Sequence, residues 1–130
     1  KKGVVYYNDS KGTNPDAAIK GIQAMNRPTL LIGGGYDKQS GYDEWIEAFD
    51  GKVRYLVLIG QTRDKIAECA KAHGFYDIMY AEDMSEAVRV CASYANMGDN
   101  VLLSPACASW GMFKNYEERG RIFKECVRSL

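Results

Sequence analysis

The sequence predicts an α/β domain with a Rossmann-like, three-layer α/β/α sandwich and a mostly parallel sheet. Apolar stretches of strand length alternate with amphipathic stretches along all 130 residues. Most of these strands are continuously apolar, which is typical of a parallel sheet covered by helices on both faces. Polar or glycine-rich loops follow three of them, at the place where such sheets bind ligands. We therefore expect a single domain with its ligand site at the carboxyl ends of the strands.

Local signals mark the start of most helices. Asn14 followed by Pro15 indicates a helix start, because asparagine caps the first turn and proline fits the first helical position. Thr62 is expected to cap the helix after the third strand, and Asp83 or Ser85 the helix after the fourth. The predicted strands are residues 4–7, 29–32, 53–59, 77–80 and 100–103, and the predicted helices begin near residues 15, 45, 62, 83 and 116.

The composition excludes some classes of function. Hydrophobic residues make up 46% of the chain, and 17 basic residues balance 17 acidic residues, so the formal net charge is zero. A nucleic-acid-binding domain would carry a clear positive excess. No apolar run in the sequence is long enough to cross a membrane. We therefore expect a globular cytoplasmic domain that binds neither nucleic acid nor membrane.

The cysteines and the histidine do not predict a metal site. The four cysteines form no C-x-x-C pair, and the single histidine, His73, shows no ligand-type neighbour in the sequence pattern. We therefore expect no bound metal. Three of the cysteines fall within predicted helices, where buried free thiols are common, and we expect a reducing compartment. The cysteines are Cys69, Cys91, Cys107 and Cys126.

Three loops are expected to meet at one edge of the sheet, because the carboxyl ends of parallel strands lie together. They cover residues 9–14, 33–38 and 104–116. Lys38, on the glycine-rich loop, could bind a carboxylate or phosphate or could be an ordinary surface lysine. Ser109 could offer a hydroxyl and a backbone N–H to an anion, or could complete a turn.

Other residues of these loops allow two interpretations. Thr13 could contact a ligand or cap the following helix. Asp9 and Lys11 could form a salt bridge or contact a nucleotide. Trp110 and Tyr116 could wall a pocket or cover the core.

The loops lack the arrangements of common catalytic sites. Ser109 and Cys107 have no histidine near them in the sequence, so nucleophilic catalysis is not supported. Paired carboxylates are missing from the three loops, which argues against glycosidase-type acid–base chemistry. The glycines after the second strand depart from the phosphate-binding pattern, because Lys38 stands where its last glycine would be. We expect no catalytic residue on this chain and infer a site that holds an anionic small molecule.

Four segments together resemble the C-terminal domain of the Mur ligases. They are Asp-Ser-Lys-Gly-Thr-Asn at 9–14, Leu-Ile-Gly-Gly-Gly-Tyr-Asp-Lys at 31–38, Leu-Ser-Pro-Ala-Cys-Ala-Ser at 103–109 and Phe-Lys-Asn-Tyr-Glu-Glu-Arg-Gly at 113–120. The resemblance extends over essentially the whole chain, in the family's order and spacing. It is strongest to the branch of the family that adds D-glutamate.

The resemblance implies a role in peptidoglycan precursor synthesis, in a three-domain enzyme of which residues 1–130 are the amino-acid-binding third domain. In that enzyme ATP phosphorylates the carboxylate of UDP-N-acetylmuramoyl-L-alanine, and the amine of D-glutamate attacks the acyl phosphate to form an amide. The family binds ATP and Mg²⁺ mainly on a central domain with a P-loop, a motif that this sequence lacks. We therefore expect this chain to carry no cofactor and to be inactive alone.

The resemblance also implies roles for residues of the three loops. Lys38 would hold a glutamate carboxylate. Ser109 and the backbone at Trp110 would bind a carboxylate of the same substrate. Thr13 would contribute from the first loop, and Tyr116 stands where the family has an aromatic residue near the substrate.

Two more residues and three departures from the family pattern complete this comparison. Asp9 and Lys11 would face the nucleotide when the domain closes on the central one. Gly12 stands where alanine is usual, which we expect to loosen the loop. Trp110 and Tyr116 stand where leucine and phenylalanine are frequent, and the larger Trp110 could narrow the pocket.

Two other kinds of function are compatible with the sequence. A sister ligase that adds L-alanine or a diamino acid, or a folylpolyglutamate synthase, would use the same domain for another substrate. A stand-alone α/β ligand-binding or regulatory module, such as a receiver-like domain, would want a cluster of acidic residues at the strand ends. Only Asp9 clearly meets that requirement.

Overall fold

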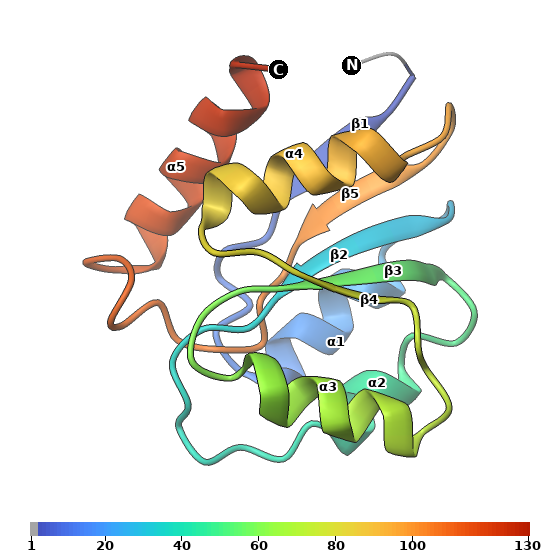
Figure 1. The fold of residues 1–130 in the computed structure, drawn as a ribbon, viewed down its shortest axis with the longest axis vertical. Helices are drawn as coiled ribbons and strands as arrows, with labels where there is room; N and C mark the ends of the chain where they lie inside the picture. Colours follow the sequence, from blue (N-terminus) through green and yellow to red (C-terminus); the bar gives the residue numbers. More distant parts are fainter. Residues whose placement is uncertain (1–2) are drawn as a thin grey trace.

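The computed structural model describes residues 3–130, which form a five-stranded sheet with the order β1-β5-β2-β3-β4 (Figure 1). All pairings between neighbouring strands are parallel. The last strand in the sequence, β5, therefore lies between β1 and β2. The strands are β1 (Val5–Asn8), β2 (Thr29–Gly33), β3 (Val53–Leu58), β4 (Ile78–Tyr80) and β5 (Asn100–Leu103).

Helices cover both faces of the sheet. Three of them, α1, α2 and α3, lie on one face, and α4 and α5 lie on the other (Figure 1). This arrangement confirms the predicted α/β/α sandwich and the predicted order of its elements. Within the described residues, no helix has the length and apolarity that crossing a membrane requires. The helices are α1 (Pro15–Gln23), α2 (Asp43–Glu47), α3 (Arg63–Ala72), α4 (Met84–Tyr94) and α5 (Tyr116–Arg128).

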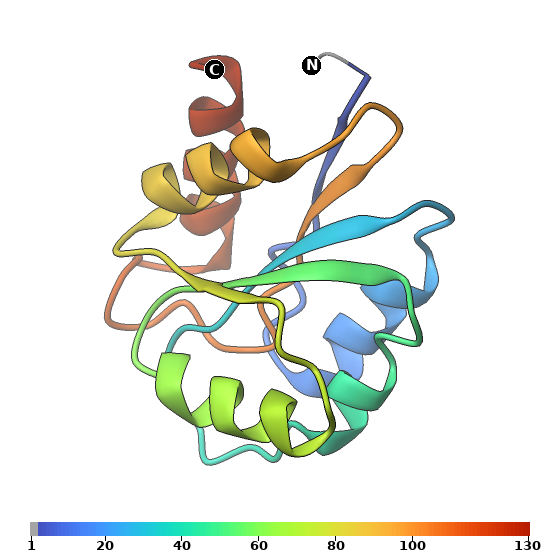
Figure 2. The same cartoon turned by 45° about the vertical axis from the view of Figure 1, so that its right-hand side comes forward.

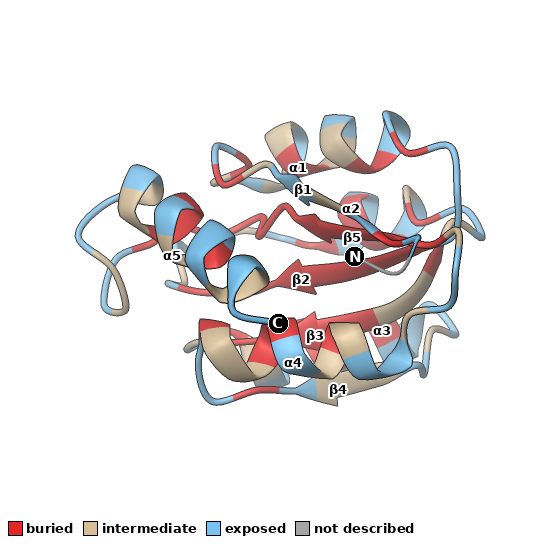
Figure 3. Cartoon of the chain, turned by 90° about the horizontal axis from the view of Figure 1, so that it is seen from above, coloured by how far each residue is buried: buried red, intermediate tan, exposed pale blue. Residues whose placement is uncertain are grey.

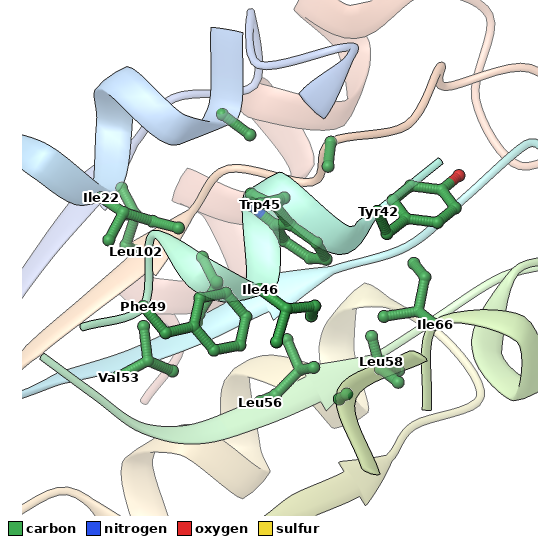
Figure 4. Packing of buried hydrophobic residues seen from close by; sticks show 14 of the residues in the cluster. Ile22, Tyr42, Trp45, Ile46, Phe49, Val53, Leu56, Leu58, Ile66 and Leu102 are labelled. Carbon is green, nitrogen blue, oxygen red and sulfur yellow. The ribbon is translucent and has the colours of Figure 1, made fainter. Parts of the chain in front are cut away.

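The strands divide their side chains between two hydrophobic clusters. Successive residues of a strand point to opposite faces of the sheet. Leu31 and Leu102 accordingly pack with Trp45 beneath α1, α2 and α3, a cluster that Figure 4 shows from close by. Leu30 and Val101 pack against α4 and α5 on the other face. Figure 3 shows the central strands coloured as buried, which explains why their sequences are continuously apolar.

Side-chain caps fix the starts of three helices. Asn14 begins α1, and its side-chain oxygen accepts a hydrogen bond from the backbone N–H three residues later at 2.9 Å. Asp83, rather than Ser85, begins α4 with the same contact at 2.8 Å. Asn115 begins α5 in this way too, at 2.8 Å. Each cap satisfies a backbone donor that the first turn of a helix leaves without a partner.

The sequence predicted that the side chain of Thr62 caps α3, and this prediction is wrong. It occupies the position before the helix, but its hydroxyl accepts a hydrogen bond from the backbone N–H of Gly35 at 3.0 Å. The same oxygen lies 3.5 Å from the sulfur of Cys107. Because Thr62 is buried against these two loops, its side chain stabilises the edge of the sheet instead of the helix start.

We expect Leu31→Ala to lower the free energy of unfolding by about 2–5 kcal/mol, because truncation of a buried leucine leaves a cavity. Leu31 lies in the central strand β2 and is 0% exposed. Val5, which is 40% exposed on the edge strand β1, provides the control, and Val5→Ala should cost under about 1 kcal/mol. Urea unfolding followed by circular dichroism measures both changes. Equal losses for the two variants would contradict the burial pattern.

Candidate functional site

The three predicted loops meet at one edge of the sheet. Asn8 of β1 pairs with Leu103 of β5, and Leu103 pairs with Ile32 of β2, so the three strands end together. In Figure 2 the orange segment after β5 passes beside the cyan segment after β2. The expectation that these loops share an edge is therefore confirmed.

Backbone hydrogen bonds join the glycine-rich loop to the loop after β5. The N–H of Gly34 donates to the carbonyl oxygen of Pro105 at 2.9 Å. The N–H of Tyr36 donates to the carbonyl oxygen of Ala108 at 3.0 Å. Gly34 has a φ of +100°, and a Cβ atom at this position would lie 2.2 Å from the carbonyl oxygen of Ile59. Because no side chain fits there, the glycine allows the close approach that fixes the base of this loop.

Lys38 lies beside the ring of Trp110 on the rim of this edge. Its Nζ atom is 5.9 Å from the centroid of the Trp110 ring, within the range of a cation–π contact. The ring of Tyr36 meets the Trp110 ring edge-on, with centroids 5.2 Å apart. Trp110 is 54% exposed, so it lies at the surface and does not cover the core. The exposed Lys38 ammonium group is therefore available to an anion.

Ser109 is the buried neighbour of this rim. Its carbonyl oxygen accepts a hydrogen bond from the N–H of Phe113 at 3.0 Å, so the residue does complete a turn. Ser109 is 5% exposed, and within residues 3–130 no hydrogen bond of its hydroxyl group is seen. A cavity of about 310 Å³ lies at this rim, lined by Gly35, Tyr36, Gln61, Trp110, Gly111 and Met112.

A buried arginine joins the first and third loops to α5. Arg119 is 1% exposed, and its guanidinium group makes three hydrogen bonds. Nε donates to the hydroxyl oxygen of Ser10 at 2.9 Å, and Nη2 donates to the carbonyl oxygen of Ser10 at 2.6 Å. Nη1 donates to the carbonyl oxygen of Cys107 at 2.9 Å. The hydroxyl of Ser10 in turn donates to the carbonyl oxygen of Tyr116 at 2.6 Å, which closes the network.

Sequence reasoning missed Arg119, although its position in the helix contained a signal. Arg119, Gly120 and Phe123 are the buried residues of α5, so the arginine lies on the inward side of the helix. A charged residue at an inward position predicts a buried partner network. Burial lowers the pKa of Arg119 to about 10, so the group stays protonated at neutral pH.

Asp9 contacts the third loop rather than its neighbour Lys11. The hydroxyl of Ser104 donates to the Asp9 carboxylate at 2.7 Å, and no salt bridge joins Asp9 to Lys11 in the described chain. A Cβ atom on Gly12 would lie 2.7 Å from the Ser104 hydroxyl oxygen. Gly12 also donates its N–H to the carbonyl oxygen of Asp9 at 2.9 Å. The glycine therefore makes room for this contact.

Lys11 and Tyr116 line a groove between the first loop and α5. Its volume is about 500 Å³, and Asp9 forms part of its wall. Tyr116 thus lies in a different cavity from the one at Trp110. Of the six residues that α5 contributes to the groove, three are cationic and one, Glu117, is acidic. The residues from α5 are Tyr116, Glu117, Gly120, Arg121, Lys124 and Arg128.

Thr13 does not cap α1, because Asn14 occupies that position. Thr13 is half-buried, and its backbone N–H donates to the carbonyl oxygen of Lys11 at 2.7 Å. This hydrogen bond holds residues 11–13 in a tight turn.

The cysteines are free thiols within the described chain, and Cys107 is the one at the site. Burial raises the pKa of its thiol, so it is not an activated nucleophile.

The sequence pattern showed no ligand-type neighbour for His73, and that interpretation was wrong. Asp43 and Cys69 lie next to it. The spacing of Cys69 and His73, four residues apart in a helix, is the signal that the sequence offered.

The fold and the joined loops at its carboxyl edge define a Rossmann-like α/β domain of the kind that places ligands at strand ends. Residues 1–107 match the family model described as "Mur ligase, glutamate ligase domain". The chain belongs to this family, as its sequence resemblance implied.

Curated relatives match the chain over its whole length. The UDP-N-acetylmuramoylalanine–D-glutamate ligase of Lachnoclostridium phytofermentans is 65% identical over 100% of the chain. Proteins of the same name from Lachnospira eligens and Clostridioides difficile are 63% and 52% identical, over 100% and 98% of the chain. The chain spans 29% of the length of the first two and 28% of the third.

Solved structures share the fold at low sequence identity. One is a domain of a Haemophilus ducreyi protein assigned as a UDP-N-acetylmuramate:L-alanyl-gamma-D-glutamyl-meso-diaminopimelate ligase. It has a TM-score of 0.59 and 15% identity, and the match covers 96% of this chain and 93% of that one. Another is the MurF ligase of Thermotoga maritima in complex with ADP, with a TM-score of 0.54 and 18% identity, which covers 100% of this chain and 30% of that one.

We expect Arg119→Met to lower the free energy of unfolding by about 2–4 kcal/mol, because it leaves the carbonyl groups of Ser10 and Cys107 buried without a donor. The matched control is Arg121→Met on the exposed side of the same helix, where the loss should stay within about 0.5 kcal/mol. Thermal and urea unfolding measure both. A loss for Arg119→Met as small as the control's would show that the network does not stabilise the loops.

Proposed function

We propose that this chain is the amino-acid-binding C-terminal domain of an ATP-dependent ligase that adds D-glutamate to UDP-N-acetylmuramoyl-L-alanine in the cytoplasm. This amide-forming reaction belongs to peptidoglycan precursor synthesis. Relatives that are 65% and 63% identical bear the name of that ligase. Since the chain spans 29% of their length, the rest of such an enzyme would bind the UDP-linked acyl donor, ATP and Mg²⁺.

The observation that carries this proposal is the junction between Lys38 and the loop after β5. D-Glutamate has two carboxylates, and a dicarboxylate is held well by separate donors of hydrogen bonds. The ammonium group of Lys38 would bind one carboxylate. The hydroxyl of Ser109 and the backbone N–H of Trp110 would bind the other. Backbone hydrogen bonds join the two loops, so the backbone positions that carry these donors are held together before the ligand arrives.

Thr13 and Tyr116 complete the proposed substrate-binding set. Thr13 would donate its hydroxyl from the first loop. Tyr116 would offer an aromatic contact from the first turn of α5, on the side of the groove that it lines with Asp9 and Lys11 rather than in the cavity at Trp110. The residues of that groove would face the nucleotide when the rest of the enzyme closes on this domain, and its cations fit a polyphosphate.

The contribution of this chain would be orientation rather than bond-making chemistry. Its loops hold no activated nucleophile, since burial raises the pKa of the Cys107 thiol. ATP with Mg²⁺ would activate the acyl donor as an acyl phosphate on the remainder of the enzyme. Fixing both carboxylates of D-glutamate on this domain would leave the amine as the free end of the substrate, directed at the activated carbon.

The other functions are less well supported by what the molecule shows. Relatives at 52–65% identity carry the name of the D-glutamate ligase, which disfavours a sister ligase with another amino acid. A receiver-like module would need several free carboxylates at the strand ends. Of the acidic residues on the three loops, Asp9 is bound by the hydroxyl of Ser104 and Asp37 forms a salt bridge with Lys65.

We expect D-glutamate, and not L-glutamate, to shift the NMR signals of Thr13, Lys38 and Ser109 in the 130-residue chain. The reason is that a site with three fixed donors distinguishes the two stereoisomers, whereas a single surface lysine does not. A ¹H–¹⁵N titration with each isomer is the measurement. Equal shifts with both isomers would indicate a general carboxylate site and would favour the alternatives.

In the longer enzyme we expect Lys38→Ala to raise the KM for D-glutamate by about 10–100-fold, because it removes a charge-assisted hydrogen bond. The KM for ATP should stay unchanged. Lys114→Ala serves as the control, because Lys114 is an exposed lysine near the same edge. A loss of equal size in both variants, or a change confined to the KM for ATP, would refute the assignment of Lys38.

A further inference from the structure

A second cluster of functional groups lies between α2 and α3, apart from the residues of the proposed substrate site. Asp43 is the first residue of α2, Cys69 lies within α3, and His73 follows its last turn. The carboxylate Oδ1 of Asp43 is 2.8 Å from Nε2 of His73 and 3.6 Å from Sγ of Cys69. The ligand atoms of all three residues lie within 4.8 Å of one another.

The three side chains provide the donor atoms that a zinc-type cation prefers. Thiolate, imidazole and carboxylate are ligands of Zn²⁺ and of Co²⁺ or Ni²⁺, whereas Mg²⁺ and Ca²⁺ take oxygen ligands. In a tetrahedral zinc site the ligand atoms are separated by about 3–4 Å, given metal–ligand bonds of about 2.0–2.3 Å. The atoms of Asp43, Cys69 and His73 therefore need only small movements to share one cation.

A second acidic residue lies on the other side of the histidine ring. Oε2 of Glu47 is 4.0 Å from Nδ1 of His73, while Nε2 faces Asp43. Histidine ligands of metals commonly direct their second nitrogen at a carboxylate, which orients the ring and leaves the first nitrogen free to bind. At 4.0 Å Glu47 is beyond hydrogen-bond distance, and a side-chain movement of about 1 Å would give it this orienting contact.

The backbone and the core hold these groups in place. Cys69 and His73 are four residues apart at the end of α3, so their side chains project from the same side of the helix. The α2 side is anchored by Trp45 and Phe49, whose rings pack edge-on with centroids 5.4 Å apart. Phe49 in turn packs on Phe75, directly after α3, with centroids 5.1 Å apart. The two halves of the cluster are thus fixed relative to one another.

We propose that Asp43, Cys69 and His73 bind one zinc-type divalent cation, with water as the fourth ligand, and that the cation cross-links α2 to α3. The thiol proton passes to solvent as the sulfur–metal bond forms. Asp43 and His73 are exposed and Cys69 is half-buried, so a cation reaches the site from solvent. The proposal is independent of the proposed ligase function, because none of these residues belongs to the sheet-edge site.

Cobalt provides a direct test, because Co²⁺ bound to a thiolate has an intense charge-transfer absorption that other ligands do not give. We expect a titration of the 130-residue chain with Co²⁺ to produce this absorption with a single equivalent, and Zn²⁺ to abolish it by competition. Zn²⁺ should also raise the Tm of the chain, because a ligand that binds the folded state stabilises it.

Cys69→Ser should eliminate the absorption and the rise in Tm. Cys126→Ser is the matched control, because Cys126 is also a half-buried helical cysteine but lies on α5 outside the cluster. This control should behave like the unchanged chain. Glu47→Gln should keep the absorption and weaken the affinity for Co²⁺ by about tenfold, as expected for a residue that orients a ligand. His73→Gln offers a second variant if Cys69→Ser fails to fold.

Two results would overturn the proposal. One is the absence of the thiolate–cobalt absorption in the unchanged chain. The other is an equal loss of absorption in Cys69→Ser and Cys126→Ser, which would locate the sulfur ligand elsewhere. In either case Asp43 and His73 form only a hydrogen-bonded pair between two helices.

Discussion

The guanidinium group of Arg119 is the contact on which the arrangement of the sheet edge depends. It binds Ser10 in the first loop and Cys107 in the third, although these segments are far apart in the sequence. A buried charge is costly unless its donors are satisfied. Here carbonyl and hydroxyl oxygens take that role without a carboxylate partner, so the cation gains hydrogen bonds only when both loops are in place. The arginine thereby makes the loops, β1, β5 and α5 mutually dependent.

The edge that results has two sides with different chemistry. On one side, Lys38 and Trp110 lie where the glycine-rich loop is joined to the loop after β5. On the other side, Lys11 and Tyr116 line a cationic groove against α5. Between them the buried network around Arg119 and Ser104 fixes the backbone. A domain built in this way can present an amino acid and face a phosphate-bearing ligand at once, as the proposed function requires.

Features that depend on residues close together in the chain could be predicted from the sequence. Asn14 and Asp83 cap helices through residues three positions away, and the apolar strands predicted both covered faces. Contacts between distant segments could not be predicted in this way. Thr62 has the residue type of a helix cap, but a backbone N–H from another loop competes for its hydroxyl. Arg119 and Asp43 likewise find their partners only after the chain has folded.

The strand order has a consequence for the way the molecule is synthesised. β1 pairs in the sheet with β5, and β5 is made last of the five strands. While the ribosome is still translating the first three quarters of the chain, β2, β3 and β4 can pair, but β1 has no neighbour to accept it. Insertion of β5 between β1 and β2 is therefore the event that closes the sheet and brings the three loops together. A nascent chain that stops short of this strand carries every residue of the first two loops and still has no binding edge.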